Sequence, residues 1–114
     1  MQNNDISEMK VLDLPLMSQW YLMIELGRKP EEYRETKPYW CKRLLGLDHL
    51  LFSYRNGYQQ CNRKGYTHVR FRYGYTKRTM LFKIKEIVVG RGNPEWGAPT
   101  DRDVFIIKLG ERVA

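Results

Sequence analysis

Residues 67–89, THVRFRYGYTKRTMLFKIKEIVV, decide the fold class of this chain of 114 residues. From Thr67 to Tyr73 basic and apolar side chains alternate, which is the period of a strand with one buried face. A turn at Gly74 leads into a second alternating segment from Thr79 to Val89. The two segments predict a β-hairpin with an apolar inner face and a cationic outer face. The inner residues are Val69, Phe71, Tyr73, Met80, Phe82, Ile84 and Val88, and the outer ones are His68, Arg70, Arg72, Lys83 and Lys85.

Further elements are predicted on both sides of this hairpin. Upstream we expect a strand over 11–14, a helix over 16–26, a helix over 39–45 that stops at Gly46, and a strand over 51–55. Pro15 suits the first turn of the earlier helix, Gly27 closes it, and its Leu16, Trp20 and Ile24 recur at a spacing that predicts a core-facing stripe. Residues 104–109 are almost continuously apolar and predict a buried central strand. This order of elements predicts an α+β domain with a curved or closed sheet.

The composition is that of a small globular domain. Hydrophobic residues make up 42% of the chain, which excludes disorder, and this length is enough to bury one core. No apolar run approaches the roughly 20 residues that span a bilayer, and the N-terminus lacks the apolar segment of a signal peptide. We therefore expect a cytoplasmic protein, monomeric or weakly dimeric and without membrane contact, with a frayed segment over 1–9 and one domain over 10–114.

The cysteines and histidines do not suggest a metal centre. Cys41 and Cys61 are 20 positions apart and are expected to be thiols in a reducing compartment. With His49 and His68 they make four conceivable zinc ligands, but no two of them lie at the short spacing that organises a site in advance. We expect neither a metal nor another cofactor.

The basic excess of the chain is concentrated in one segment. The net charge is +7, and residues 61–91 carry nine basic side chains against one acidic one. Tyrosines lie among these cations, so the segment offers charge for phosphates and flat rings for unpaired bases. The alternatives are a solvated basic face and tyrosines half-buried on a sheet. The residues predicted to bind nucleic acid are Arg63, Lys64, Arg70, Arg72, Tyr75, Lys77, Arg78, Lys83 and Lys85.

The most specific motif lies outside that segment, at residues 27–34, GRKPEEYR. A helix that ends in glycine, followed by Lys29, Glu32 and Arg34, resembles the signature of the ASCH domain, a small β-barrel of the PUA-like superfamily. Downstream segments at 68–72, 74–75, 93–98 and 104–110 are similar to one branch of that family in order and spacing. The resemblance covers about residues 10–112. It implies a barrel with helices packed at its ends and a cleft proposed to bind RNA or a nucleotide.

The residues of that cleft have compatible chemistry. Lys29 and Arg34 are suited to neutralise a phosphate, and Glu32 to accept hydrogen bonds from a base edge. Trp96, in a turn between Pro94 and Gly97, is predicted either to cover the barrel end or to form a stacking wall. The alternative for the charged residues is an ion pair that only holds the strand.

Two other functions remain open from the sequence. Some small ASCH-type proteins are amidohydrolases of acetylated cytidine that use a lysine and a threonine three residues later. Lys29 matches that lysine, but the later position is Glu32, so the nucleophilic hydroxyl is missing and no catalytic residue is assigned. Lys29 with Glu32 could activate water by a different mechanism. The third possibility is a protein-interaction domain whose basic face meets an acidic partner.

Overall fold

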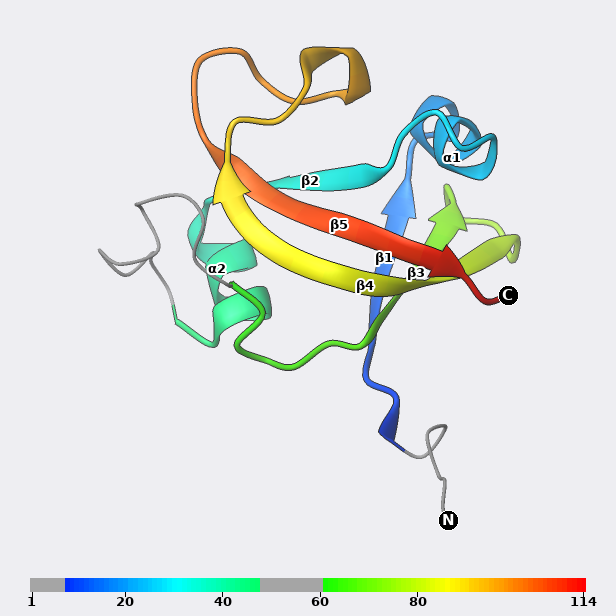
Figure 1. Cartoon of the computed structure of the whole chain (residues 1–114), viewed down its shortest axis with the longest axis horizontal. Helices are drawn as coiled ribbons and strands as arrows, with labels where there is room; N and C mark the ends of the chain where they lie inside the picture. Colours follow the sequence, from blue (N-terminus) through cyan, green and yellow to red (C-terminus); the bar gives the residue numbers. More distant parts are fainter. Residues whose placement is uncertain (1–7, 48–60) are drawn as a thin grey trace.

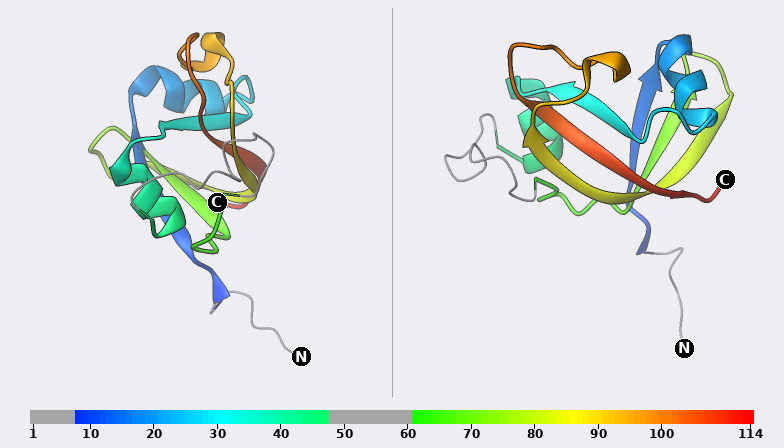
Figure 2. Two further views of the ribbon diagram at one scale, coloured as in Figure 1. Left: turned by 90° about the vertical axis from the view of Figure 1, so that its left-hand side faces the viewer. Right: turned by 45° about the horizontal axis from the view of Figure 1, so that its top comes forward.

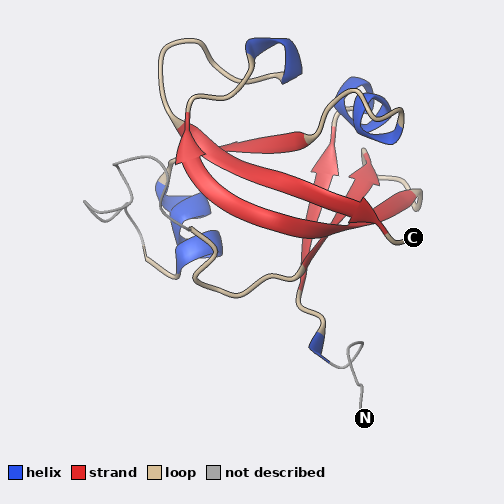
Figure 3. Ribbon diagram, in the orientation of Figure 1, coloured by secondary structure: helices blue, strands red, loops and turns tan. Residues whose placement is uncertain are grey.

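Five strands form one mixed sheet in the computed structural model of the chain, which describes residues 8–47 and 61–114 (Figure 1). The strands are β1 (Val11–Leu16), β2 (Glu31–Glu35), β3 (His68–Tyr73), β4 (Thr79–Gly90) and β5 (Val104–Arg112). The helices are α1 (Ser18–Glu25) and α2 (Pro38–Leu45), and the long loop between β4 and β5 contains the short 3-10 helix η3 (Pro94–Trp96) (Figure 3). The strand predicted over 51–55 and most of the N-terminal segment 1–9 lie outside the described residues.

The sheet curls into a half-barrel with β1 and β2 as its two edges. Its strand order is β1-β3-β4-β5-β2, in which β1 and β3 are parallel and the other neighbours are antiparallel. The long strand β4 has two register shifts on its β5 side, between Phe82 and Glu86. Bulges of this kind bend a strand and increase its twist, and β4 sweeps in an arc from β3 to the far end of β5 (Figures 1 and 2). The predicted α+β class with a curved sheet is confirmed.

The predicted hairpin is confirmed, but the inner face changes along β4. Val69 pairs with Phe82 and Phe71 with Met80, and all four side chains are buried. Beyond the bulges it is Ile87 and Val89 that face the main core, whereas Val88 lies in a second cluster on the other side of the sheet. The prediction that Val88 shares the face of Met80 is therefore wrong, because one inserted residue moves every later side chain to the opposite face.

The helices follow the sequence pattern at their ends more closely than at their beginnings. Gly27 and Gly46 both have φ of +78° and end α1 and α2 as expected. Pro15, however, belongs to β1 and not to the first turn of α1. Because β1 is an edge strand, a residue without an N–H is tolerated there. Leu16 is therefore a strand residue, and the stripe predicted for one helix is divided between two elements.

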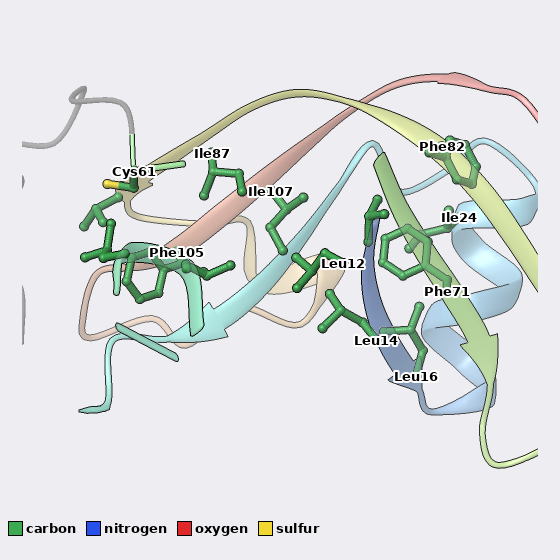
Figure 4. Packing of buried hydrophobic residues seen from close by; sticks show 14 of the residues in the cluster. Leu12, Leu14, Leu16, Ile24, Cys61, Phe71, Phe82, Ile87, Phe105 and Ile107 are labelled. Atoms are coloured by element: carbon green, nitrogen blue, oxygen red, sulfur yellow. The ribbon is translucent and has the colours of Figure 1, made fainter. Parts of the chain in front are cut away.

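The main core fills the concave side of the sheet. It contains Leu12, Leu14 and Leu16 from β1, Phe71 from β3, Ile87 from β4 and Phe105 and Ile107 from β5, and it extends to α1 and α2 (Figure 4). The predicted buried strand over 104–109 is confirmed for Val104–Ile107, all four of which are buried. The second, smaller cluster contains Tyr33, Val88, Ala98, Val104 and Ile106, with Trp96 packed against it.

Candidate functional site at the open edge of the sheet

Edge strand β2 turns charged side chains toward the concave side of the sheet. Glu32 pairs with Ile107 and Arg34 with Phe105, and directly opposed residues in an antiparallel ladder share a face. Ile107 and Phe105 belong to the main core, so the carboxylate and the guanidinium lie on its side. Tyr33 points the other way, into the second cluster. The alternation of β2 therefore places polar groups where a strand of this sheet would otherwise contribute apolar ones.

Lys29, just before β2, joins Glu32 and Arg34 in a network of ion pairs. Lys29 is 2% exposed and Glu32 5%, which is unusual for ionic side chains and requires pairing. The Lys29 ammonium lies 3.1 Å from one carboxylate oxygen of Glu32. The Arg34 guanidinium donates to the other oxygen. Both carboxylate oxygens are thus held by a cation, and the orientation of Glu32 is fixed.

Lys29 ties three segments together from behind the site. Its ammonium also donates to the backbone carbonyl of Trp96, and it lies 4.6 Å from the ring centroid of Tyr33 and 5.2 Å from that of Trp20. These contacts join β2, α1 and the η3 loop. Desolvation by the surrounding rings lowers the pKa of Lys29 below 10.5, although the neighbouring Glu32 opposes this shift.

Arg34 spans the gap between the two edge strands. Its guanidinium donates to the carbonyl of Tyr33 at 2.7 Å and reaches the carbonyl of Pro15 in β1 at 3.4 Å. It also lies over the ring of Trp40 in α2, 5.1 Å from the centroid. The half-barrel is thus bridged on this side by a side chain, because β1 and β2 are not neighbours in the sheet.

A pocket of about 260 Å³ lies at this gap, and we call it the seam pocket. Two tryptophans, a glutamate, an arginine and a methionine are among its lining residues. Gly97 allows the Trp20 ring to approach the η3 loop, because a Cβ there would lie 3.0 Å from Cζ2 of Trp20. The lining residues that matter for its chemistry are Met17, Trp20, Glu32, Arg34, Trp96 and Gly97.

The η3 loop that carries Trp96 is anchored at several points. The Asn93 side chain accepts from the N–H of Glu95 at 2.9 Å, and the N–H of Asn93 donates to the hydroxyl of Tyr33 at 2.9 Å. That hydroxyl donates in turn to Glu31 at 2.6 Å, and burial together with this bond raises the pKa of Tyr33. Figure 2 shows the loop lying over β2. The Trp96 wall of the seam pocket is therefore fixed relative to β2.

The structure brings three of the four predicted cleft residues into one lining. Glu32, Arg34 and Trp96 line the seam pocket, whereas Lys29 is buried behind Glu32. Trp20 was predicted to lie in the core, and the structure instead places it half-buried in the pocket wall. If the first strand is extended through Pro15 and Leu16, the predicted helix begins later and buries a different face. Pro15 is therefore the signal that could have identified Trp20 as a pocket residue.

The residues predicted to bind nucleic acid are divided between two ends and one face of the sheet. Because β1 and β3 are parallel, their C-terminal ends lie side by side, next to the seam pocket. The turn after β3, which carries Tyr75, Lys77 and Arg78, lies at the same end of the sheet. Arg63 and Lys64 precede β3 and lie at the opposite end, where Lys10, just before β1, donates to the Lys64 carbonyl at 2.7 Å. Several of the cations between these ends have carboxylate partners, among them Arg70 with Asp13 at 3.4 Å and Lys83 with Glu111 at 3.8 Å.

The described residues contain no cluster of metal ligands and no membrane-spanning helix, and both cysteines are buried. Within residues 8–47 and 61–114 no group of three or more His, Cys, Asp or Glu side chains is placed to hold a metal ion. No helix in the same residues is long and apolar enough to cross a membrane. Cys41 and Cys61 are both buried, and burial raises the pKa of Cys61 to about 11.

Comparisons of the chain with protein-family models, curated proteins and solved structures found no match. The function proposed below therefore rests on the residues of the seam pocket and its surroundings.

Proposed function

We propose that this chain is a non-catalytic RNA- or nucleotide-binding module of the ASCH type, with the seam pocket as the site for one base. The observation that carries the proposal is that two tryptophans, Trp20 and Trp96, line the same pocket as the fixed pair of Glu32 and Arg34. Unpaired bases are recognised by stacking on flat side chains and by hydrogen bonds along their edges. This lining supplies groups for both.

The polar pair keeps hydrogen-bonding capacity for a ligand. A carboxylate has about four lone-pair sites, so Glu32 can accept from a base amino or imino group while Lys29 and Arg34 hold it. Hydrogen bonds to Glu32, Tyr33 and Pro15 engage three of the five N–H donors of the Arg34 guanidinium. Donors and acceptors are thus presented side by side, as the edge of a base requires.

The basic segment supports the same function at longer range. Arg72, Lys77 and Arg78 lie at the pocket end of β3 and β4 and can attract the phosphates that accompany a base. An acidic protein would meet the same charge, but it has no use for a pocket with two tryptophans beside a hydrogen-bonding pair. The pocket therefore favours nucleic acid over an acidic protein partner.

Hydrolysis of an acylated nucleoside is the second candidate, favoured by the desolvated Lys29 next to Glu32. Two features of the geometry favour binding instead. The Lys29 ammonium is directed to Glu32 and to the Trp96 carbonyl behind the pocket, and both oxygens of Glu32 already accept from cations. The described residues that line the pocket also include no serine, threonine or cysteine to act as a nucleophile.

The test measures the fluorescence anisotropy of a short, labelled, single-stranded RNA of mixed sequence, with a duplex of the same composition as comparison. We expect the single strand to bind more tightly and its affinity to fall steeply with salt. Arg34→Lys keeps the charge but loses the planar fork, and we expect it to weaken binding about tenfold. Arg102→Lys, at an exposed arginine paired with Glu35, is the matched control and should bind like the wild type.

Three results would reject the proposal. They are the absence of binding to both the single strand and nucleoside monophosphates, equal affinity for the duplex, and an Arg34→Lys variant indistinguishable from Arg102→Lys. Turnover of acetylcytidine that is lost in Lys29→Ala would establish the hydrolase in its place.

A further inference from the structure

A second hollow adjoins the seam pocket. It has a volume of about 220 Å³ and is lined by Pro15, Leu16, Met17, Gly74 and Tyr75. The first three of these residues also line the seam pocket, so the two hollows meet at the segment 15–17. We call the second one the turn hollow, because the β3–β4 turn forms its far wall.

Tyr75 in this wall is almost completely exposed on a braced turn. Tyr75 is 96% exposed, and Met17, which also lines the hollow, is 68% exposed. The N–H of Gly74 donates to the carbonyl of Leu16 at 2.9 Å, which fastens the turn to the end of β1. The Thr76 hydroxyl donates to the carbonyl of Tyr73 at 2.7 Å, and Arg72 donates to that of Thr76 at 3.1 Å. The backbone that presents the tyrosine ring is therefore ordered before any ligand arrives, which lowers the entropy lost on binding.

The charge around the turn hollow identifies its occupant. Lys77 and Arg78 follow Tyr75 after one intervening residue, Thr76, and Lys77 is exposed. Arg78 is held by Glu25 at 2.8 Å and lies over the rings of Tyr21 and Tyr73, so its guanidinium is fixed at the base of the turn. A flat exposed ring next to cations is the combination that single-stranded nucleic acids stack on, since it serves a base and a phosphate together.

We infer that the turn hollow is a second base site and that the molecule binds two consecutive nucleotides of a single strand. This inference rests on the proposed function. One base occupies the seam pocket, its neighbour stacks on Tyr75 against Met17, and the phosphate between them passes over residues 15–17 on the side of Lys77. In a duplex both faces of each base are already stacked on neighbouring bases, so a double strand cannot use the pair of sites.

The experiment compares a single-stranded tetranucleotide of mixed sequence with the nucleoside monophosphates, using wild type, Tyr75→Ala and Tyr75→Phe. We expect Tyr75→Ala to weaken the tetranucleotide about tenfold and to leave the affinity for monophosphates unchanged, because only the second base uses the ring. Tyr75→Phe keeps the ring and should bind both probes like the wild type. Since the side chain is almost fully exposed, both variants should keep the wild-type midpoint of urea unfolding.

The outcomes separate this inference from the proposed function. If monophosphates bind and Tyr75→Ala changes neither affinity, the second site is rejected and the first one stands. Equal weakening of both probes by Tyr75→Ala would place Tyr75 in the first site and also reject the inference. A Tyr75→Phe variant as weak as Tyr75→Ala would reject stacking as the contact. Failure of both probes to bind the wild type would reject the two proposals together.

Discussion

The seam pocket and the outer face of the β3–β4 hairpin both pair basic side chains with carboxylates, but in different environments. In the network behind the pocket, the side chains of Lys29 and Glu32 are 1% and 7% exposed. On the hairpin, the side chain of Lys83 is 56% exposed, and that of its partner Glu111 in β5 is 72% exposed. Water screens the exposed pair but not the buried one. Removing one partner of the buried pair therefore lowers the free energy of unfolding more than removing one partner of the exposed pair.

The comparison also shows why a sum of charges along the chain does not locate a site. Residues 61–91 contain almost all of the basic excess, yet Arg70, Arg78 and Lys83 are paired with carboxylates from other segments. The seam pocket is built mainly from the first half of the chain, where basic and acidic residues are equal in number. A fixed polar pair between aromatic rings defines the candidate site, and the basic segment contributes attraction near it.

The largest expected effect is on stability at Lys29. Lys29→Met removes one partner of a buried ion pair and the donor to the Trp96 carbonyl, so we expect the free energy of unfolding to fall by roughly 3–5 kcal/mol. Lys83→Met on the hairpin should change it by less than about 0.5 kcal/mol. Urea unfolding of the two variants measures the difference, and equal losses would show that burial does not separate the two regions.

A smaller effect is expected where the η3 loop approaches β2. A Cβ on Gly92 would lie 2.6 Å from both Cβ of Ala98 and Cε1 of Tyr33, so Gly92→Ala overpacks this contact and should cost about 1–3 kcal/mol. Gly90→Ala is the control, because its Cβ meets only ordinary contact, 3.7 Å from Cδ1 of Ile106. Thermal unfolding compares them. If Gly92→Ala is as stable as Gly90→Ala, the loop is not packed on Tyr33 as described.

The pH dependence of stability should carry the signature of the buried lysine. Burial lowers the pKa of Lys29, so between that pKa and the ordinary 10.5 the folded chain holds fewer protons than the unfolded chain. Over this window the contribution of Lys29 to the free energy of unfolding rises with pH, by no more than roughly 1.4 kcal/mol per pH unit. The stability of the wild type relative to Lys29→Met should therefore increase from neutral pH toward pH 10.5. A constant difference would contradict the lowered pKa.

The smallest expected effect distinguishes the two ends of the sheet. Lys77→Gln, in the turn next to the seam pocket, should weaken binding of single-stranded RNA a few-fold and reduce the slope of log affinity against log salt by about 0.7. Lys64→Gln removes the same charge at the opposite end and should leave the slope unchanged. Anisotropy titrations over a range of salt concentrations measure both. Equal changes in slope would mean that the strand follows the whole basic segment.

Local patterns in the sequence were sufficient to predict much of the fold. Alternation predicted the β3–β4 hairpin, and Gly27 and Gly46 predicted two helix ends, since each signal depends on residues close together in the chain. The bulges that divert Val88 from the face of Met80 depend on how β4 bends across β5. The parallel pairing of β1 with β3 joins segments more than 50 residues apart, and no local pattern reports it.

The candidate site was predictable in part for the same reason. Glu32, Arg34 and Trp96 were found from motifs, and the structure brings them into one lining. The burial of Lys29 was not predictable, because it depends on Trp20, Tyr33 and the Trp96 carbonyl, which come together only in three dimensions. The helical spacing of Leu16, Trp20 and Ile24 predicts a core position for Trp20, but Leu16 and Pro15 belong to a strand and not to this helix.

The most direct test of the central claim uses the three tryptophans, whose indole N–H groups give separate signals in a proton–nitrogen NMR spectrum. The spectrum is recorded during titration with nucleoside monophosphates and with the single-stranded tetranucleotide. A base in the seam pocket should shift the indole signals of Trp20 and Trp96 with both ligands and leave the backbone amides of Lys83 and Lys85 unmoved by the monophosphates. Shifts confined to the hairpin face, with both indole signals unmoved at saturation, would contradict the claim that the seam pocket is the binding site.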